Sequence, residues 1–135
     1  MRVAAAVNAG YGDRYMSVGR ESSIRQELSS GIVRFYSDKF GRGPTQARSY
    51  VEDTHATVLL GDVQTTVERT LTAHGHDVLV REMRRCVKAA YRDEIVALVE
   101  QVTGRQVVAM HSDHDPATNT SAYIFLFAEP DSEGP

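Results

Sequence analysis

A corner at Gly41-Arg42-Gly43-Pro44 is the sequence feature that most constrains the fold of this chain. Before it, apolar residues recur every three or four positions, which indicates one face of a helix, and after it a strand pattern begins. Glycine adopts a positive φ without a Cβ clash, so Gly41 predicts the C-cap of the helix. Pro44 then blocks any continuation of that helix. The sequence therefore predicts a turn from helix to strand at this point.

The two glycines of the corner also permit a phosphate-binding interpretation. Phosphate-binding glycine loops precede a helix N-terminus, where free N–H groups and the positive end of the dipole face the anion. This corner follows a helix C-terminus, which favours cations instead. We therefore interpret Gly41 to Pro44 first as a structural cap with Arg42 suited to the helix dipole, and keep anion binding by Arg42 as the alternative.

Capping and turn signals place the other elements along the chain. Ser22 and Ser23 offer a helix N-cap, and Thr65 with Glu68 forms a capping-box pattern. Asp53-Thr54 marks a tight turn between two strands. The predicted elements are a helix from Ser23 to Lys39, strands at 47–52 and 55–60, helices at 66–73 and 78–103 with Gly104 as C-cap, and strands at 106–110 and 121–128.

The order α-β-β-α-α-β-β predicts one α+β domain at residues 21–129. We expect two layers, a four-stranded, mainly antiparallel sheet with the helices packed on one face. Residues 1–20 are interrupted by glycines and are predicted to be a flexible leader. Residues 130–135 are acidic and rich in Gly and Pro, which predicts a disordered tail.

The long helix predicted at 78–103 carries two patterns. The apolar face of its second half is rotated by roughly 60° from that of its first half, so the helix meets two surfaces. The second surface is either a partner subunit or a core that curves around the helix. Basic residues also follow one stripe of the first half, where a solvated face is the ordinary interpretation. They are Arg81, Arg85, Lys88 and Arg92, with Arg84 at the edge.

Composition excludes several classes of protein. A net charge of −3 over 135 residues argues against non-specific binding to nucleic acid. The single cysteine, Cys86, excludes an internal disulfide framework and fits a reducing compartment. No apolar run is long enough for a transmembrane helix, and the apolar patch at the N-terminus is too short for a signal peptide. We therefore expect a cytoplasmic protein that does not insert directly into a membrane.

Two groups of residues are candidates for a functional site. Arg42, Arg48, Arg84 and Arg85 would form a site for an anionic ligand or a protein partner if the corner packs against the long helix. His111, Asp113, His114 and Asp115 lie close together in sequence and could bind a divalent metal ion. The same segment, through Thr120, is also rich in the residues of hairpin loops. We assign no catalytic residue and no cofactor.

The chain resembles the bacterial domain-of-unknown-function family labelled MpsC, which is associated with a sodium-translocating, membrane-potential-generating system. The resemblance spans about residues 22–129. It rests on 30–34, Gly41-Arg42-Gly43-Pro44, Thr65 to Leu71, Arg84-Arg85, Thr103-Gly104-Arg105 and the closing strand. The start of the short helix departs from it, because Gln64-Thr65-Thr66 stands where relatives have Leu-Thr-Pro. The resemblance implies a soluble accessory to a membrane complex that transports ions or inorganic carbon, and it supplies no catalytic residues.

These observations support three hypotheses of function. The favoured one is a non-enzymatic accessory or regulatory module, most simply a two-fold homodimer, because the last strand is strongly apolar and the long helix faces two ways. The second is a sensor that binds a small anion or a nucleotide through the four arginines. The third is a metal-dependent enzyme that uses the segment from His111 to Asp115.

Overall fold

The helix before the glycine corner lies along one edge of an antiparallel sheet in the computed structural model, which describes residues 18–130. This helix, α2 (Val18–Phe40), ends at Gly41, whose φ of 84° and backbone hydrogen bond to Ser37 O confirm the predicted C-cap. Of the predicted leader at residues 1–20, residues 1–17 lie outside the described residues, and the last three belong to α2. Of the predicted tail at 130–135, residues 131–135 also lie outside them.

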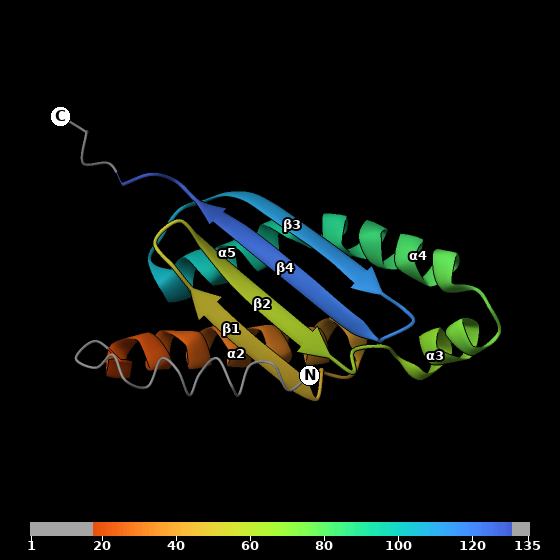
Figure 1. Ribbon diagram of the computed structural model, residues 1–135. Coiled ribbons are helices and arrows are strands. Elements are labelled where there is room, and N and C mark those ends of the chain that lie inside the picture. Colours follow the sequence, from red (N-terminus) through yellow and green to blue (C-terminus); the bar gives the residue numbers. More distant parts are fainter. Residues whose placement is uncertain (1–17, 131–135) are drawn as a thin grey trace.

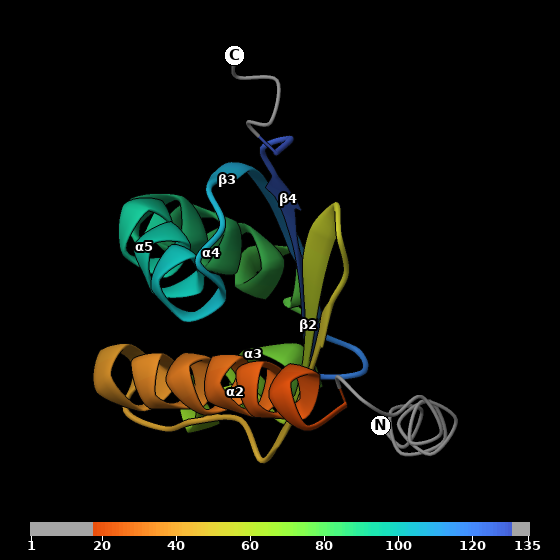
Figure 2. The same cartoon turned by 90° about the vertical axis from the view of Figure 1, so that its left-hand side faces the viewer.

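Four antiparallel strands form one sheet in the order β1-β2-β4-β3 (Figure 1). Every helix within residues 18–130 lies on the same side of this sheet (Figure 2). The α+β fold is thereby confirmed. After α2 the elements are β1 (Gln46–Val51), β2 (His55–Gly61), α3 (Thr66–Ala73), α4 (Asp77–Ala90), α5 (Arg92–Thr103), β3 (Val107–Asp115) and β4 (Thr120–Phe127).

The core lies between the helices and the inward side of the sheet. Strand alternation directs every second residue of β2 and β4 into it, and α2 and α5 close it from the helix layer. The buried apolar residues include Leu28, Ile32, Phe35 and Tyr36 of α2, Ala56, Val58 and Leu60 of β2, Ile95 and Val99 of α5, and Tyr123, Phe125 and Phe127 of β4.

Three predicted boundaries are wrong. Ser22 and Ser23 do not cap α2, because the helix begins at Val18 and runs through both serines. A Ser-x-x-Gln pattern alone cannot mark the start of a helix when the residues before it are also helical. The predicted strand at 106–110 continues through His111 to Asp115, so the segment first interpreted as a hairpin loop is mostly strand.

The helix predicted at 78–103 is divided at Tyr91 into α4 and α5. Tyr91 packs edge-on against Phe35 of α2, with ring centroids 5.5 Å apart. The break reconciles the two differently oriented buried faces that the sequence pattern indicated. The interpretation of the basic stripe as a solvated face is wrong for Arg84 and Lys88, which are buried, whereas Met83 is 39% exposed.

The outward side of the sheet is unusually apolar at its centre. Ala122, Ile124 and Leu126 point away from the helices along β4, and all three are exposed. The strand register aligns Arg48 of β1, Leu59 of β2, Ala122 of β4 and Asp113 of β3 in one row across this side. A shallow hollow of about 400 Å³, whose lining includes Leu59, Asp113 and Ala122, lies over part of that row. Among residues 18–130, no helix combines the length and the apolar character that a membrane crossing requires.

Candidate functional site

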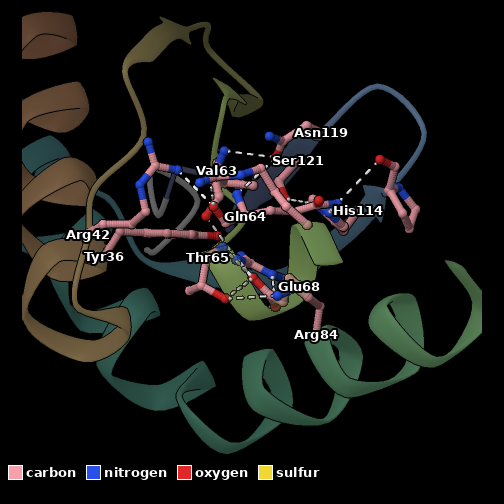
Figure 3. A network of polar contacts seen from close by, with 12 residues as sticks. Tyr36, Arg42, Val63, Gln64, Thr65, Glu68, Arg84, His114, Asn119 and Ser121 are labelled. Carbon is pink, nitrogen blue, oxygen red and sulfur yellow. Dashed lines mark hydrogen bonds and ion pairs between the residues drawn. The ribbon is translucent and has the colours of Figure 1, made fainter. Parts of the chain in front are cut away.

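The segment Asp62-Val63-Gln64, between β2 and α3, is the centre of a network of polar contacts (Figure 3). Arg42 donates to the carbonyl oxygens of Asp62 (2.8 Å) and Gln64 (2.9 Å) and forms an ion pair with the Asp62 carboxylate (3.1 Å). From the other side, the side-chain oxygen of Asn119 accepts the backbone N–H groups of Val63 and Gln64. The glycine corner, the β3–β4 turn and the start of α3 are therefore held at one point.

Asp62 helps to anchor this segment in a constrained backbone. Its φ is 60°, in the left-handed region that costs a non-glycine residue energy. Hydrogen bonds from Arg42 and then Thr45 lower the pKa of its carboxyl group. The carboxylate partner of Arg42 belongs to the same chain, which favours a structural role for this arginine over anion binding.

A buried ion pair joins α3 to α4 beneath this segment. Arg84, only 1% exposed, donates to Glu68 through Nε (2.8 Å) and Nη2 (2.6 Å), and Nη2 also donates to Val63 O. Glu68 completes the predicted capping box with Thr65, which is confirmed. Burial raises the pKa of Glu68, but hydrogen bonds from Arg84 and Thr65 outweigh it, so the net shift is downward. One carboxylate thus caps α3 and neutralises Arg84.

Lys88, one turn after Arg84 on α4, is a second buried cation. Its side chain is 4% exposed, and its Nζ has no hydrogen-bond partner among the described residues. The ammonium lies 5.1 Å from the ring centroid of Tyr123, a cation–π distance. Tyr123 in turn shares a hydrogen bond of 2.7 Å between hydroxyl groups with Tyr36. Burial, followed by the charge of Arg84, lowers the pKa of Lys88 to about 8.

His114 of β3 lies on the inward side of the sheet and is 2% exposed. Its Nε2 lies 2.9 Å from Gln64 Nε2, which can only donate, so Nε2 accepts and Nδ1 carries the proton. Nδ1 therefore donates to Ser121 Oγ, 2.7 Å away. Burial and then the charges of Arg84 and Lys88 lower the pKa of His114 to about 4, so the ring is neutral near pH 7.

The Ser121–His114 pair has the spacing of a nucleophile and its base but not the chemistry. A general base must accept the hydroxyl proton, whereas here Nδ1 already carries a proton. A base also works best with a pKa near the operating pH, and burial of His114 moves its pKa far below that. The arrangement instead gives a buried site with two cationic side chains, Arg84 and Lys88, against one carboxylate, Glu68.

The four candidate arginines are only partly brought together. Arg42 and Arg84 both bind the 62–64 segment, from opposite sides. Arg48 is exposed on the outward side of β1. Arg85 is exposed on α4 and lies 3.6 Å from Glu82.

The four candidate metal ligands are divided by strand alternation. His114 points inward, whereas His111, Asp113 and Asp115 are exposed on the other side of β3. Arg81 of α4 holds Asp113 in a two-bond ion pair. Within residues 18–130, no three His, Cys, Asp or Glu side chains gather closely enough to hold a metal ion.

Sequence reasoning missed Lys88, Gln64 and the tyrosine pair. The sequence pattern places Lys88 in a solvated basic stripe, because long basic side chains usually cover helix surfaces. A signal was present, since Val80, Arg84 and Lys88 recur at four-residue spacing on one face. That face competes with one formed by Leu79, Met83 and Cys86, and periodicity alone cannot choose between them.

Comparison with known proteins supplies the family. No curated protein matches the chain, and no solved structure matches it. Residues 20–129 match the model of a family described as "Na+-translocating membrane potential-generating system (MpsC)". That span includes the glycine corner, the 62–64 segment, the buried ion pair and the whole sheet. The chain therefore belongs to the MpsC family.

Proposed function

We propose that this protein is a non-enzymatic accessory module of the MpsC family that acts as a homodimer through the outward side of its sheet. The observation that carries the proposal is the apolar outward side of β4, formed by Ala122, Ile124 and Leu126. In an antiparallel sheet with one solvated side, outward residues are usually polar. A contiguous exposed apolar surface is typical of an interaction site.

A second copy of the chain is the occupant that fits this surface. The row across it has a cation, Arg48, at one edge, apolar Leu59 and Ala122 in the middle, and Asp113 at the other edge. A two-fold axis along the strands, between β2 and β4, superposes the row on its own reverse. Arg48 of each copy then faces Asp113 of the other, where it joins the existing pair with Arg81. Such an isologous contact is self-complementary in charge and in apolar character.

The family description gives the process in which this dimer would act. It names a system that translocates Na⁺ and generates a membrane potential. We infer a cytoplasmic accessory role beside the membrane components of such a system, in the transport of ions or inorganic carbon. The internal pairing of Glu68 with Arg84, and the protonated Nδ1 of His114, support a binding role over a catalytic one.

Charge substitutions on the outward side of the sheet, with a control on α4, test this proposal. We expect Ile124→Lys and Leu126→Lys to convert the dimer to a monomer in sedimentation velocity, because each places a like-charge pair at the two-fold interface. Leu79→Lys is the matched control, since Leu79 is an exposed apolar residue (54%) on α4. It should leave the dimer intact.

Two results would contradict the proposal. A wild-type chain that is monomeric at tens of micromolar concentration would exclude the dimer as the working form. A dimer broken by Leu79→Lys and unaffected by Ile124→Lys would place the interface on α4 instead of the sheet.

A further inference from the structure

A small cavity lies between α4 and β3. Its volume is about 220 Å³. Cationic side chains dominate its wall, and the one acidic group, Asp113, is already paired with Arg81. The lining includes Arg81, Arg85 and Lys88 of α4, Arg92 of α5, and Ser112 and Asp113 of β3.

Lys88 lies between this cavity and the buried side chains of Arg84 and Tyr123. Its side chain lines the cavity, while its Nζ is enclosed beside the ring of Tyr123 and has no hydrogen-bond partner among the described residues. A buried ammonium without an acceptor is costly. The four-carbon stem of lysine is flexible, so rotation about its terminal bonds can bring Nζ to the cavity. An anion there would supply the acceptor that the fold does not.

The remaining cations at the cavity are free to contribute. The contact of Arg85 with Glu82 spans 3.6 Å between two side chains that are more than half exposed, and exposed pairs of this kind contribute little. The contact of Arg92 with the adjacent Asp93 spans 3.8 Å, with Asp93 fully exposed. Both guanidinium groups can therefore turn to a ligand, for which their planar forks suit an oxyanion.

The size of the cavity selects the class of anion. Pockets for drug-sized ligands and cofactors occupy about 300–1,000 Å³, which is more than this cavity offers. We propose that the protein binds a small oxyanion, of the size of phosphate, sulfate or a simple carboxylate, between Lys88, Arg85 and Arg92. None of these three residues lies on the outward side of the sheet, but two other residues of the cavity wall, Arg81 and Asp113, also belong to the proposed dimer contact.

The chain offers a clean spectroscopic test, because Lys39 and Lys88 are its only lysines. In the full-length protein with labelled lysine, sodium phosphate is titrated at constant ionic strength against sodium chloride, and the two side-chain Cε resonances are followed by NMR. We expect the Lys88 resonance to shift and saturate while that of Lys39 stays in place. Parallel titrations with sulfate and acetate distinguish tetrahedral from planar oxyanions.

Variants separate binding from folding. Phosphate that binds only the folded protein should raise its melting temperature. Lys88→Met keeps the length of the side chain and is expected to abolish this rise without unfolding the protein. Arg85→Ser with Arg92→Ser should weaken phosphate binding about tenfold or more, since hydrogen bonds to charged groups are lost. Arg34→Ser, which removes an exposed arginine of α2, is the matched control and should bind as the wild type does.

The proposal is overturned if none of the three anions shifts the Lys88 resonance. It is equally overturned if Lys39 and Lys88 shift together without saturation, which would indicate general screening of charge. A Lys88→Met variant that retains the full phosphate-induced stabilisation would also contradict it.

Discussion

Two buried basic side chains, His114 and Lys88, respond to pH in windows that the structure assigns. Both are held in the interior against the cost of charging them, and each lies near Arg84. For such groups the folded state binds fewer protons than the unfolded state between the folded and unfolded pKa values. Stability therefore rises with pH inside each window.

For His114 the window is acidic. Its pKa falls from 6.5 to about 4 on folding, with Arg84 and Lys88 opposing its protonation and Glu68 and Asp115 favouring it. Above pH 6.5 we expect His114 to contribute nothing to the pH dependence of the free energy of unfolding. As the pH falls to 4, it should lower this free energy by about 3 kcal/mol. Urea denaturation of the wild type and of His114→Gln between pH 7 and 4 measures the difference. If the free energy of unfolding changed with pH in the same way for the wild type and His114→Gln, His114 would not be the buried titrating group.

For Lys88 the window is alkaline. Its pKa falls from 10.5 to about 8, so the charged form destabilises the fold below pH 8, and the penalty is relieved as the pH rises toward 10. Lys88→Met should remove this penalty, with a gain of about 1–3 kcal/mol at pH 7, because a flexible apolar side chain replaces a buried ion. Denaturation midpoints at pH 7 and pH 9.5 check both the gain and its decrease at alkaline pH. A variant less stable than the wild type at pH 7 would show that the ammonium is satisfied in the fold.

Among the helices and strands, α3 and α4 depend on one carboxylate with two tasks. Glu68 accepts the N–H of Thr65 at the start of α3 and the two N–H groups of Arg84 from α4. The two tasks differ in energy. A lost cap costs about 1 kcal/mol, whereas a buried charge left without its partner costs about 3–5 kcal/mol.

We therefore expect Glu68→Ala to destabilise the fold several times more than Thr65→Ala does. Thr65→Ala removes only the cap hydroxyl and leaves the ion pair with Arg84 in place. Urea denaturation of both variants at pH 7 provides the comparison. Equal losses of stability would mean that the pair with Arg84 contributes no more than the cap.

The elements also differ in how much of their structure can be predicted from the sequence. The order of helices and strands, the C-caps at Gly41 and Gly104 and the Thr65–Glu68 capping box follow from local signals that the structure confirms. These signals act within a few residues, so they survive any tertiary arrangement. The inward direction of Arg84 and Lys88 could not be read in the same way. It depends on Glu68, Val63 and Tyr123, whose contacts with Arg84 and Lys88 are formed by the tertiary fold.

The same limit applies to the candidate metal segment. Its residue types suit a loop, yet β4 extends the ladder through Asp115 and strand alternation then separates His114 from His111, Asp113 and Asp115. Pairing with β4 overrides the loop preference of these residues, since each added ladder residue satisfies backbone hydrogen bonds.

On the scale of the whole molecule, the two layers leave one apolar surface uncovered by any described helix. α2 lies over β1, and α4 and α5 lie over β3, so the described helices all cover the same side of the sheet (Figure 2). The opposite side has Ile124 and Leu126 at its centre, with Arg48 and Asp113 toward its edges. The proposed dimer follows from this asymmetry.

Sedimentation equilibrium of the unmodified 135-residue chain is the decisive measurement for the proposed dimer. Over a concentration range from about one to about one hundred micromolar at pH 7, we expect a mass twice that of the chain, falling toward the single-chain mass for Ile124→Lys. A wild-type chain that keeps the single-chain mass over that whole range would exclude the dimer.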